Sequence, residues 1–363
     1  MNPRAILLDI LDLARWAPSG DNTQPWRFEI IDDQHVAVHG FDTREHCVYD
    51  LDGHASQLAL GCLLENIAIA ASAHGLRGEV TRRQDEPDSA PVFDVRLHSD
   101  RALDTDLLVS AIASRTVQRK TMRTAPLTPA QQAQLSAAAH PYEVLWFGSL
   151  KQRTQIARLT FDNAKIRLTI PEAFAVHRAV IEWGSRFSAD KVPDQAIGAS
   201  PLSLKLMRWA MQKWERIEFL NTWLGGTLAP RIELDFLPGL CCAAHAVLLA
   251  PALPLTLDDH VAAGRTVQRF WLTATHLGLQ LQPEMTPLIF ARYARYARIF
   301  SQKPKACAQA RTLAARLDRL LGENRQPRAV FMARLGMGKQ AVSARSLRLP
   351  LEQLWWAPPP AEK

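Results

Sequence analysis

The sequence predicts an α+β fold in which one structural unit occurs twice. Apolar residues alternate over residues 26–31 and 35–39, on either side of a turn at Asp32-Asp33, and this pattern predicts a β-hairpin. Residues 262–279 resemble residues 59–76 at a constant offset of 203, and each copy has two glycines 14 residues apart. These observations indicate a duplicated unit that contains both helix and strand.

The elements of the first unit follow from apolar spacing and turn-forming residues. Residues 5–16 have apolar side chains at spacings of three and four, which predicts a helix that ends at the turn formers of residues 17–22. Residues 58–74 are almost entirely apolar, so we expect a buried helix that stops at Gly75. A short helix is expected over residues 104–114.

A second pair of matching segments supports the repeat. Residues 92–97 predict a strand, and residues 330–335 repeat its pattern. The offset between these two segments is 238, so the second unit has about 35 more residues between its apolar helix and its strand. Residues 292–323, rich in Ala, Arg and Leu, predict an inserted helical segment at this point.

A tryptophan-rich stretch, residues 164–224, lies between the two copies. Its helical spacing is broken at Pro171, Pro193 and Pro201. It contains Trp183, Trp209, Trp214 and Trp223. Two interpretations stay open: an ordinary helical layer, or a lid over a flat aromatic ligand.

Composition narrows the class of protein. The 363 residues are 47% hydrophobic and 22% charged, which excludes global disorder and provides about two domains' length of chain. The formal net charge of +7 suits an anionic ligand such as a phosphate or nucleotide, and no block of like charge marks a nucleic-acid-binding tail. Nucleic-acid binding is therefore the weakest of the hypotheses weighed here.

Cysteine usage and apolar runs predict a cytoplasmic protein. The five cysteines are odd in number and have no CxxC spacing, so we expect a reducing compartment. Charged residues interrupt the apolar residues of 1–13, so no signal peptide is expected. The apolar run 240–257 contains His245 and two prolines, which predicts a buried element and a turn and no membrane span.

The most informative string is residues 17–26, where the first helix gives way to a strand. Ser19 and Asn22 can exchange hydrogen bonds near the backbone, and Gly20 permits close approach of a ligand. Two interpretations have equal weight, a ligand-binding turn and a polar turn that only introduces the strand.

Two basic strings offer positive charge. Arg115 and Arg119 are four residues apart, so on a helix they would share one face and could clamp a phosphate. Arg345 and Arg348 form a second pair. The alternative for each pair is a solvated basic stretch.

Other chemistries find no support in the sequence. The eleven histidines show no HExxH or other metal-ligand spacing, so no metal site is predicted. Neither GxGxxG nor GxxxxGK[ST] occurs, which counts against a Rossmann or P-loop enzyme. Cys241 and Cys242 open an apolar run and are expected to pack in the core.

Together these strings resemble the nitroreductase-like family of FMN proteins. Pro18-Ser19-x-x-Asn22-x-Gln24-Pro25-Trp26 is similar to the family's flavin-contacting turn. Arg115-Thr116-x-x-Arg119 is similar to its phosphate and pyrimidine-edge motif, with Val117 where the family carries Ser. The resemblance implies antiparallel-rich central sheets flanked by helices, with residues 160–230 as a helical lid insertion.

The order of these motifs resembles the Acg-type tandem nitroreductases, in which one chain mimics the family dimer. In the ordinary family the arginine motif precedes the turn, whereas here the turn comes first. Residues 135–146 occupy the place of the second copy's turn and carry no Ser-x-x-Asn, so one complete flavin site and one degenerate twin are expected. Molybdopterin-associated nitroreductase-like proteins remain alternative relatives.

The resemblance also implies roles for individual residues. Arg115, Arg345 and Arg348 would balance the FMN phosphate, and Arg119 would lie near flavin N1 and O2. The loop after Pro283 would present a backbone N–H near N5, from Glu284 or Met285. The expected cofactor-binding set is completed by the residues of the two motifs: Pro18, Ser19, Asn22, Gln24 and Thr116. No catalytic acid or base is assigned, because the flavin carries the hydride chemistry.

The leading hypothesis is an FMN oxidoreductase that passes hydride from NAD(P)H to a nitroaromatic, quinone or similar conjugated acceptor. The alternative is a protein that stores or sequesters FMN under its lid. We expect a first half at residues 1–110 and a second half at residues 111–363. These halves would act together as a pseudo-dimeric monomer or a weak homodimer, without nucleic-acid or membrane partners.

Overall fold

The structure is a computed structural model that describes residues 2–322 and 324–357. Its first four-stranded sheet has the order β1-β2-β4-β3, and every neighbouring pair is antiparallel. The elements of this half are α1 Pro3–Ala14, β1 Trp26–Asp32, β2 His35–Gly40, α2 His54–Ser72, β3 Leu76–Arg82 and β4 Val92–Ser99, and the short helix α3 Val109–Ser114 spans the predicted boundary at residue 110. The predicted hairpin of residues 26–39 is confirmed, with Phe28 opposite Val38.

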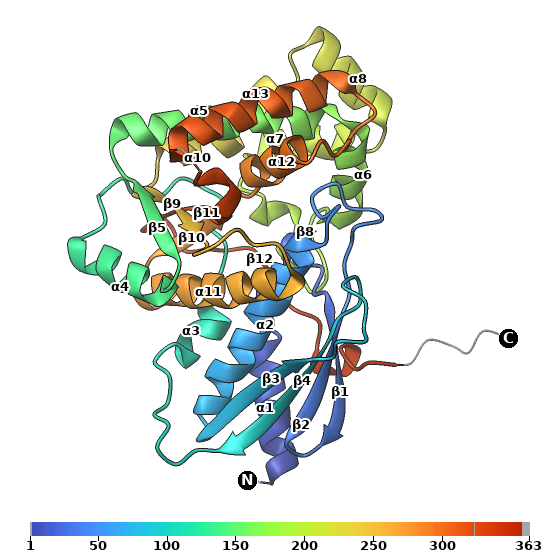
Figure 1. Cartoon of the computed structure of the whole chain (residues 1–363). Coiled ribbons are helices and arrows are strands. Elements are labelled where there is room, and N and C mark those ends of the chain that lie inside the picture. Colours follow the sequence, from blue (N-terminus) through green and yellow to red (C-terminus); the bar gives the residue numbers. More distant parts are fainter. Residues whose placement is uncertain (1, 323, 358–363) are drawn as a thin grey trace, which may run out of the picture.

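The second four-stranded sheet repeats the first. Its order is β5-β9-β11-β10, again antiparallel throughout, so β5, β9, β10 and β11 take the places of β1 to β4. The elements are α4 Pro129–Ala139, β5 Glu143–Phe147, β9 Ala244–Leu249, α11 Leu257–His276, β10 Gln280–Pro283 and β11 Ala329–Gly336. The α+β class predicted from the sequence is confirmed, and the two sheets have equivalent strand orders (Figure 1).

Two insertions distinguish the second unit. The first lies between β5 and β9, in the place of the hairpin turn between β1 and β2. Its main elements are α5 Leu150–Thr169, α6 Pro171–Val180, α7 Pro201–Ala210, α8 Trp214–Trp223, α9 Leu228–Arg231, a π-helical turn Ile232–Phe236 and α10 Leu237–Leu240. The second insertion lies between β10 and β11 and contains α12 Thr286–Arg295 and α13 Pro304–Leu321, which confirms the extra helical segment predicted there.

Two of the three prolines expected to interrupt the first insertion begin helices, and Pro193 lies in a short strand. Pro171 and Pro201 occupy the first helical positions of α6 and α7, where a missing N–H costs no hydrogen bond. Short strands β6 Ile181–Glu182, β7 Phe187–Ser188 and β8 Val192–Pro193 join these helices. Figure 1 shows this insertion at the end of the molecule opposite to the β1–β4 sheet.

The two long apolar helices cross where the repeated glycines meet. A Cβ atom added to Gly61 of α2 would lie 2.8 Å from the Cα of Gly264 on α11, and one added to Gly264 would lie 2.9 Å from the Cα of Gly61. The contact is reciprocal, as at the interface of a twofold dimer. Only glycine permits such close packing of the two backbones.

One apolar core joins both halves. Buried side chains of α1, α2 and the first sheet belong to the same cluster as those of α11 and the second sheet. Among described helices, α2 alone has the length and hydropathy of a membrane span, and most of it is buried inside the protein. It is therefore a core helix of this fold.

The end of the chain returns to the first sheet. Phe28 on β1 donates its N–H to Leu354 and accepts the N–H of Trp356. The short strand β12 Arg345–Ser346 pairs in parallel with β7. The C-terminal segment thus ties the first half to the second half's insertion.

Two local predictions were wrong. Residues 104–108 are not helical, and α3 begins only at Val109. Residues 115–120 do not form a helix either, because α3 ends at Ser114 and Arg115 leaves it with extended backbone angles. Arg115 and Arg119 therefore do not share a helical face, and any common role has to come from tertiary structure.

Candidate functional site

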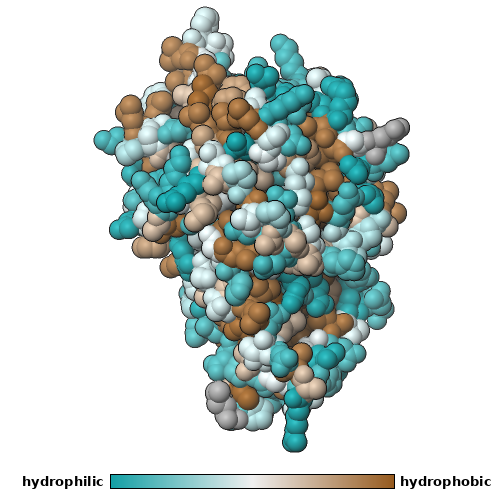
Figure 2. Space-filling model, turned by 90° about the vertical axis from the view of Figure 1, so that its left-hand side faces the viewer, coloured by the Kyte–Doolittle hydropathy of each residue, from teal (hydrophilic) through white to brown (hydrophobic). Residues whose placement is uncertain are grey.

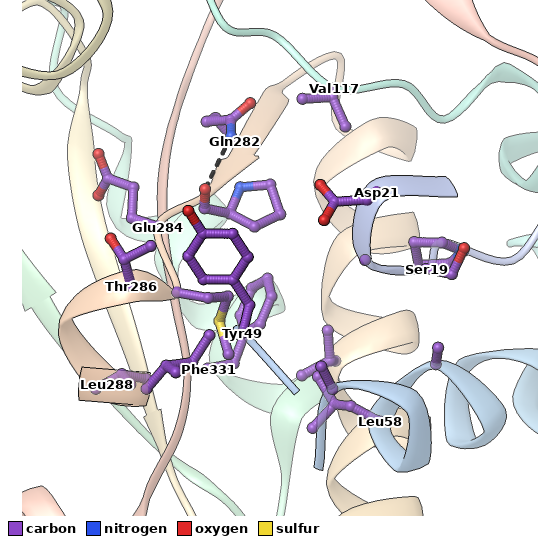
Figure 3. Close-up of a pocket in the computed structure, with 18 of the residues that line it drawn as sticks. Ser19, Asp21, Tyr49, Leu58, Val117, Gln282, Glu284, Thr286, Leu288 and Phe331 are labelled. Atoms are coloured by element: carbon purple, nitrogen blue, oxygen red, sulfur yellow. Dashed lines mark hydrogen bonds between the residues drawn. The ribbon is translucent and has the colours of Figure 1, made fainter. Parts of the chain in front are cut away.

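A cavity of 490 Å³ lies between the two halves and the first insertion. It is lined by α2 and the 17–22 turn of the first half, by β10 and α12 of the second half, and by α5 and α6 of the insertion. Figure 3 shows Asp21 and Tyr49 entering the cavity from different segments, with Glu284 and Thr286 along another wall. The volume is in the usual range for a cofactor or small-molecule pocket.

The predicted site residues gather at this cavity, with one exception. Those that line it are Pro18, Ser19, Asn22, Arg115, Thr116, Arg119, Pro283, Glu284, Met285, Arg345 and Arg348. Gln24 is fully buried outside the lining. Its amide donates to Asn22 O and Ala189 O and accepts from the N–H of Leu349, so protein groups already occupy the side chain predicted to contact the cofactor.

The 17–22 turn is shaped by side-chain hydrogen bonds. Asp21 and Asn22 have φ angles of 50° and 65°, which are unusual for residues other than glycine. The Asn22 amide donates to Ala189 O and Lys191 O, and its oxygen accepts from Arg348 at 2.8 Å. The insertion and the C-terminal segment together hold this turn against the cavity.

One end of the cavity carries a cluster of unpaired positive charges. Arg115, Arg345 and Arg348 come from residues far apart in the sequence, and none has a carboxylate within 4.0 Å in the described part of the chain. Burial lowers the pKa of Arg115 to about 10, and burial together with the other two arginines lowers that of Arg348 well below its ordinary value. Such a cluster is costly without an anion.

Backbone carbonyls and indole rings orient these guanidinium groups. Arg115 donates to Trp16 O at 3.1 Å and lies 4.5 Å from the centre of the Trp271 ring. Arg345 lies 4.8 Å from the Trp16 ring. The Nε atom of Arg115 is buried without a partner in the structure. The cluster therefore keeps a hydrogen-bond donor available to a ligand.

A second pair of arginines lies further along the cavity. Arg119 donates to Ala196 O at 3.1 Å, and its backbone carbonyl accepts from Arg334 at 2.8 Å. Burial lowers the pKa of Arg119 to about 10. The nearby Asp21 has its pKa raised by burial, an effect that the charge of Arg119 opposes.

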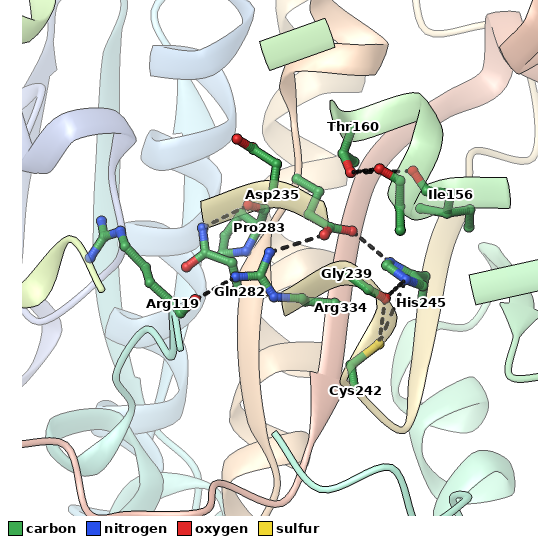
Figure 4. A network of polar contacts seen from close by, with 12 residues as sticks. Arg119, Ile156, Thr160, Asp235, Gly239, Cys242, His245, Gln282, Pro283 and Arg334 are labelled. Carbon is green, nitrogen blue, oxygen red and sulfur yellow. Dashed lines mark hydrogen bonds and ion pairs between the residues drawn. The ribbon is translucent and has the colours of Figure 1, made fainter. Parts of the chain in front are cut away.

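A buried charged network supports the wall of the cavity (Figure 4). The Glu284 carboxylate contacts His245 Nδ1 at 2.7 Å and Arg334 at 3.0 Å. Burial works against the charge on His245, but Glu284 and Cys242 outweigh it and raise the pKa of His245 to about 10. Burial likewise opposes the charge of Glu284, and the cations overcome it and lower its pKa. With His245 protonated, the network has one carboxylate and two cations and a net charge of +1.

This network corrects one predicted role. The backbone N–H of Glu284 donates to Met332 O at 2.7 Å, so it is not free to contact a flavin N5. Met285 stands at the N-cap of α12 and lines the cavity. Of the two predicted donors, only the N–H of Met285 is still a candidate.

Cys242, His245 and Glu284 resemble a Cys-His-Glu catalytic arrangement, but their geometry does not allow Cys242 to act as a nucleophile. Its Sγ lies 3.6 Å from His245 Nε2, yet that nitrogen is 2.8 Å from Gly239 O and donates to it. A protonated His245 cannot act as a base. Cys242 is fully buried, in agreement with the predicted core packing.

The part of the cavity under the insertion carries polar groups that the sequence did not indicate. Tyr49 Oη and His177 Nε2 are 2.9 Å apart, and Arg167 contacts the Asp235 carboxylate at 2.8 Å. These four residues lie on four separate segments, at spacings with no motif. The one feature of the sequence that could have indicated these polar groups is Asp235, an acidic residue in the largely apolar segment 232–237. No group of three or more metal-ligating side chains occurs among the described residues.

The fold and site define an α+β protein with two equivalent sheets and a cationic cavity between its halves. Residues 3–170 match the nitroreductase family model. This region contains both the 17–22 turn and the Arg115–Arg119 segment. A curated relative, the Mycobacterium tuberculosis (strain CDC 1551 / Oshkosh) protein described as Uncharacterized protein MT1398, is 25% identical over 325 residues.

That alignment covers 88% of this chain and 44% of the relative, so the chain spans less than half the relative's length. Among solved structures, a nitroreductase-like family protein from Bacillus cereus is similar at 13% identity and a TM-score of 0.34, over 68% of this chain and 94% of that one. The FMN-dependent nitroreductase NfnB from Mycobacterium smegmatis, solved in complex with NADPH, is similar at 18% identity and a TM-score of 0.34. This match covers 67% of the present chain and 94% of NfnB.

Proposed function

We propose that the chain binds FMN in the 490 Å³ cavity and acts as an FMN-dependent oxidoreductase. The observation that carries this proposal is the cluster of Arg115 and Arg348, both buried, with the half-buried Arg345, which has three positive charges and no carboxylate partner in the described chain. A dianionic phosphate ester would supply the missing charge and accept their hydrogen bonds.

The remaining cavity fits the rest of the cofactor. Arg119 would lie at the pyrimidine edge of the ring, where positive charge stabilises the reduced, anionic flavin. Ser19 and the N–H of Met285 would add polar contacts. Bound FMN would supply hydride transfer, while the protein binds and orients it and limits access of water.

We further propose NAD(P)H as the reductant and a nitroaromatic, quinone or similar conjugated molecule as the acceptor. The match of residues 3–170 to the nitroreductase family model supports this choice. We propose a cytoplasmic location on the cysteine usage already described.

The pseudo-dimeric arrangement is also a proposal. It is supported by the reciprocal contact of Gly61 with Gly264 and by the equal order of the two sheets. Residues 1–110 and 111–363 would each supply part of one flavin site, because the 17–22 turn comes from the first and Arg115 and Arg348 from the second. Residues 160–230 would be the lid.

Storage of FMN is the second candidate, and the insertion is the observation that favours it. Side chains of α5 and α6 line the cavity, which would restrict the entry of NAD(P)H. Adding FMN to the purified chain, desalting it and recording the visible spectrum tests binding. Anaerobic mixing with NADPH then separates the two candidates, because an oxidoreductase bleaches within a turnover time and a storage protein keeps its oxidised spectrum. A colourless desalted protein would overturn both.

A further inference from the structure

We propose that Tyr49, held by His177, forms the acceptor subsite and donates a hydrogen bond to a carbonyl or nitro oxygen of an uncharged ring. The inference rests on the proposed function and names the group that recognises the acceptor. Both side chains line the same cavity as Arg115 and Ser19. Tyr49 reaches it from the first half and His177 from α6 of the insertion.

The pairing of these two side chains fixes the position of the hydroxyl. Tyr49 Oη lies 2.9 Å from His177 Nε2, and the two rings are stacked with centres 5.8 Å apart. In Figure 3 the Tyr49 ring lies between Asp21 on one side and Glu284 and Thr286 on the other. Tyr49 and Met285, the candidate flavin contact, line the same cavity.

The hydroxyl can serve as a donor because both groups of the pair are neutral. Burial, with the charge of Arg167 as a second cause, lowers the pKa of His177 to about 3, and burial raises the pKa of Tyr49 far above its ordinary value. A neutral imidazole that donates from Nε2 to Tyr49 Oη leaves the phenol hydrogen free for a ligand oxygen. A carbonyl or nitro oxygen accepts such a bond.

The surroundings select against a charged ligand. Arg167 is already paired with Asp235 at 2.8 Å, so this pair adds no net charge to the subsite. The lining of the cavity also includes the apolar side chains of Leu234, Leu288 and Ile289. A planar apolar ring with one polar oxygen matches this combination of walls and donor.

The test uses the full chain loaded with FMN and the quinone menadione (2-methyl-1,4-naphthoquinone) as probe. Its carbonyl stretch is measured by infrared difference spectroscopy, and its dissociation constant by quenching of flavin fluorescence. Hydrogen bonding to Tyr49 shifts one carbonyl band to lower wavenumber in the wild type. Tyr49→Phe keeps the ring, loses the shifted band and weakens binding by on the order of tenfold.

Two further variants test the positioning role of His177. His177→Phe removes the partner of Oη and is expected to lose the shifted band, whereas His177→Gln keeps an N–H donor and retains it. Tyr296→Phe is the matched control, since Tyr296 lines the cavity but is exposed, and it keeps both band and affinity.

The outcomes separate this inference from the proposed function. The subsite alone would be overturned if Tyr49→Phe binds FMN normally, keeps the shifted menadione band and binds menadione within twofold of the wild type. Failure of the wild-type chain to bind FMN would overturn the proposed function, and the same infrared measurement on the flavin-free chain would still test Tyr49.

Discussion

At the scale of single residues, the site is organised by charges that the fold leaves without partners. Arg115 and Arg348 are buried at 5% and 9% exposure with no carboxylate neighbour in the described residues. By contrast, His245 and Arg334 both contact the Glu284 carboxylate. Arg115 and Arg348 therefore remain available to bind an anion, whereas the network around Glu284 stabilises the wall of the cavity.

Replacing Arg115 should have different effects on FMN affinity and on the stability of the flavin-free protein. Arg115→Met removes one of three mutually repelling cations, so the free energy of unfolding of the flavin-free protein should stay unchanged or rise. The affinity for FMN should fall by roughly 10- to 150-fold, the loss of a charge-assisted hydrogen bond. Chemical denaturation and flavin titration measure the two effects. Arg101→Met, at an exposed position, is the control, and a destabilised variant with normal FMN affinity would contradict the assignment.

The His245 pair predicts a pH dependence of stability. Its folded pKa of about 10 exceeds the ordinary value of 6.5, so the contribution is complete below pH 6.5 and is lost as the pH rises through about 10. His245→Gln should remove this slope and destabilise the fold by about 3–5 kcal/mol, since it leaves Glu284 short of a partner. Urea unfolding between pH 6 and 10 measures both. Parallel pH profiles for the two proteins would show that His245 is neutral in the fold.

The sequence motifs pointed to residues that line the cavity, but they did not point to the polar side chains that surround them. The arginines and the 17–22 turn carry recognisable spacing, and all reach the cavity. Gln24 belongs to the same motif but does not line the cavity, and its amide is hydrogen-bonded to Leu349 and Ala189. Tyr49 and His177 are 128 residues apart, and only tertiary packing brings them together.

At the scale of elements, the crossing of α2 and α11 sets the geometry of the cavity. The repeat in the sequence predicted both helices, since their apolar character and glycine spacing are local properties. It did not predict that Gly61 and Gly264 touch each other. The interruption of the second hairpin by residues 150–243 was also missed, because pairing between β5 and β9 is non-local.

Alanine at this crossing should be poorly tolerated. Gly61→Ala places a methyl group within 3 Å of the backbone of α11, which cannot move away as a side chain can. We expect a loss of about 1–3 kcal/mol or more in unfolding free energy. Gly78→Ala is the control, since its methyl would meet only side chains at 3.7 Å or more. Equal stability of the two variants would show that the helices are not so closely packed.

At the scale of the whole molecule, the two halves share one core and one site. Apolar side chains of both sheets belong to a single cluster, and the C-terminal residues 354–356 hydrogen-bond to β1. The proposed pseudo-dimer follows from this interlocking. We therefore expect the chain to unfold as one cooperative unit.

Separating the halves should abolish folding of at least the smaller part. Residues 1–110 expressed alone would expose the face of α2 that packs on α11, and we expect no cooperative thermal transition by circular dichroism. The intact chain should unfold in one transition and bind one FMN per 40.6 kDa monomer in calorimetry combined with light scattering. A sharp transition for residues 1–110, or two FMN per chain, would contradict the pseudo-dimer.

The central claim is that the arginine cluster is the phosphate site of FMN. The most direct measurement compares the dissociation constants of FMN and of riboflavin, which lacks the phosphate, for the wild type and Arg115→Met. FMN should bind the wild type at least tenfold more tightly than riboflavin, and Arg115→Met should reduce this difference while leaving riboflavin binding unchanged. Equal affinity of the wild-type chain for FMN and riboflavin would contradict the claim.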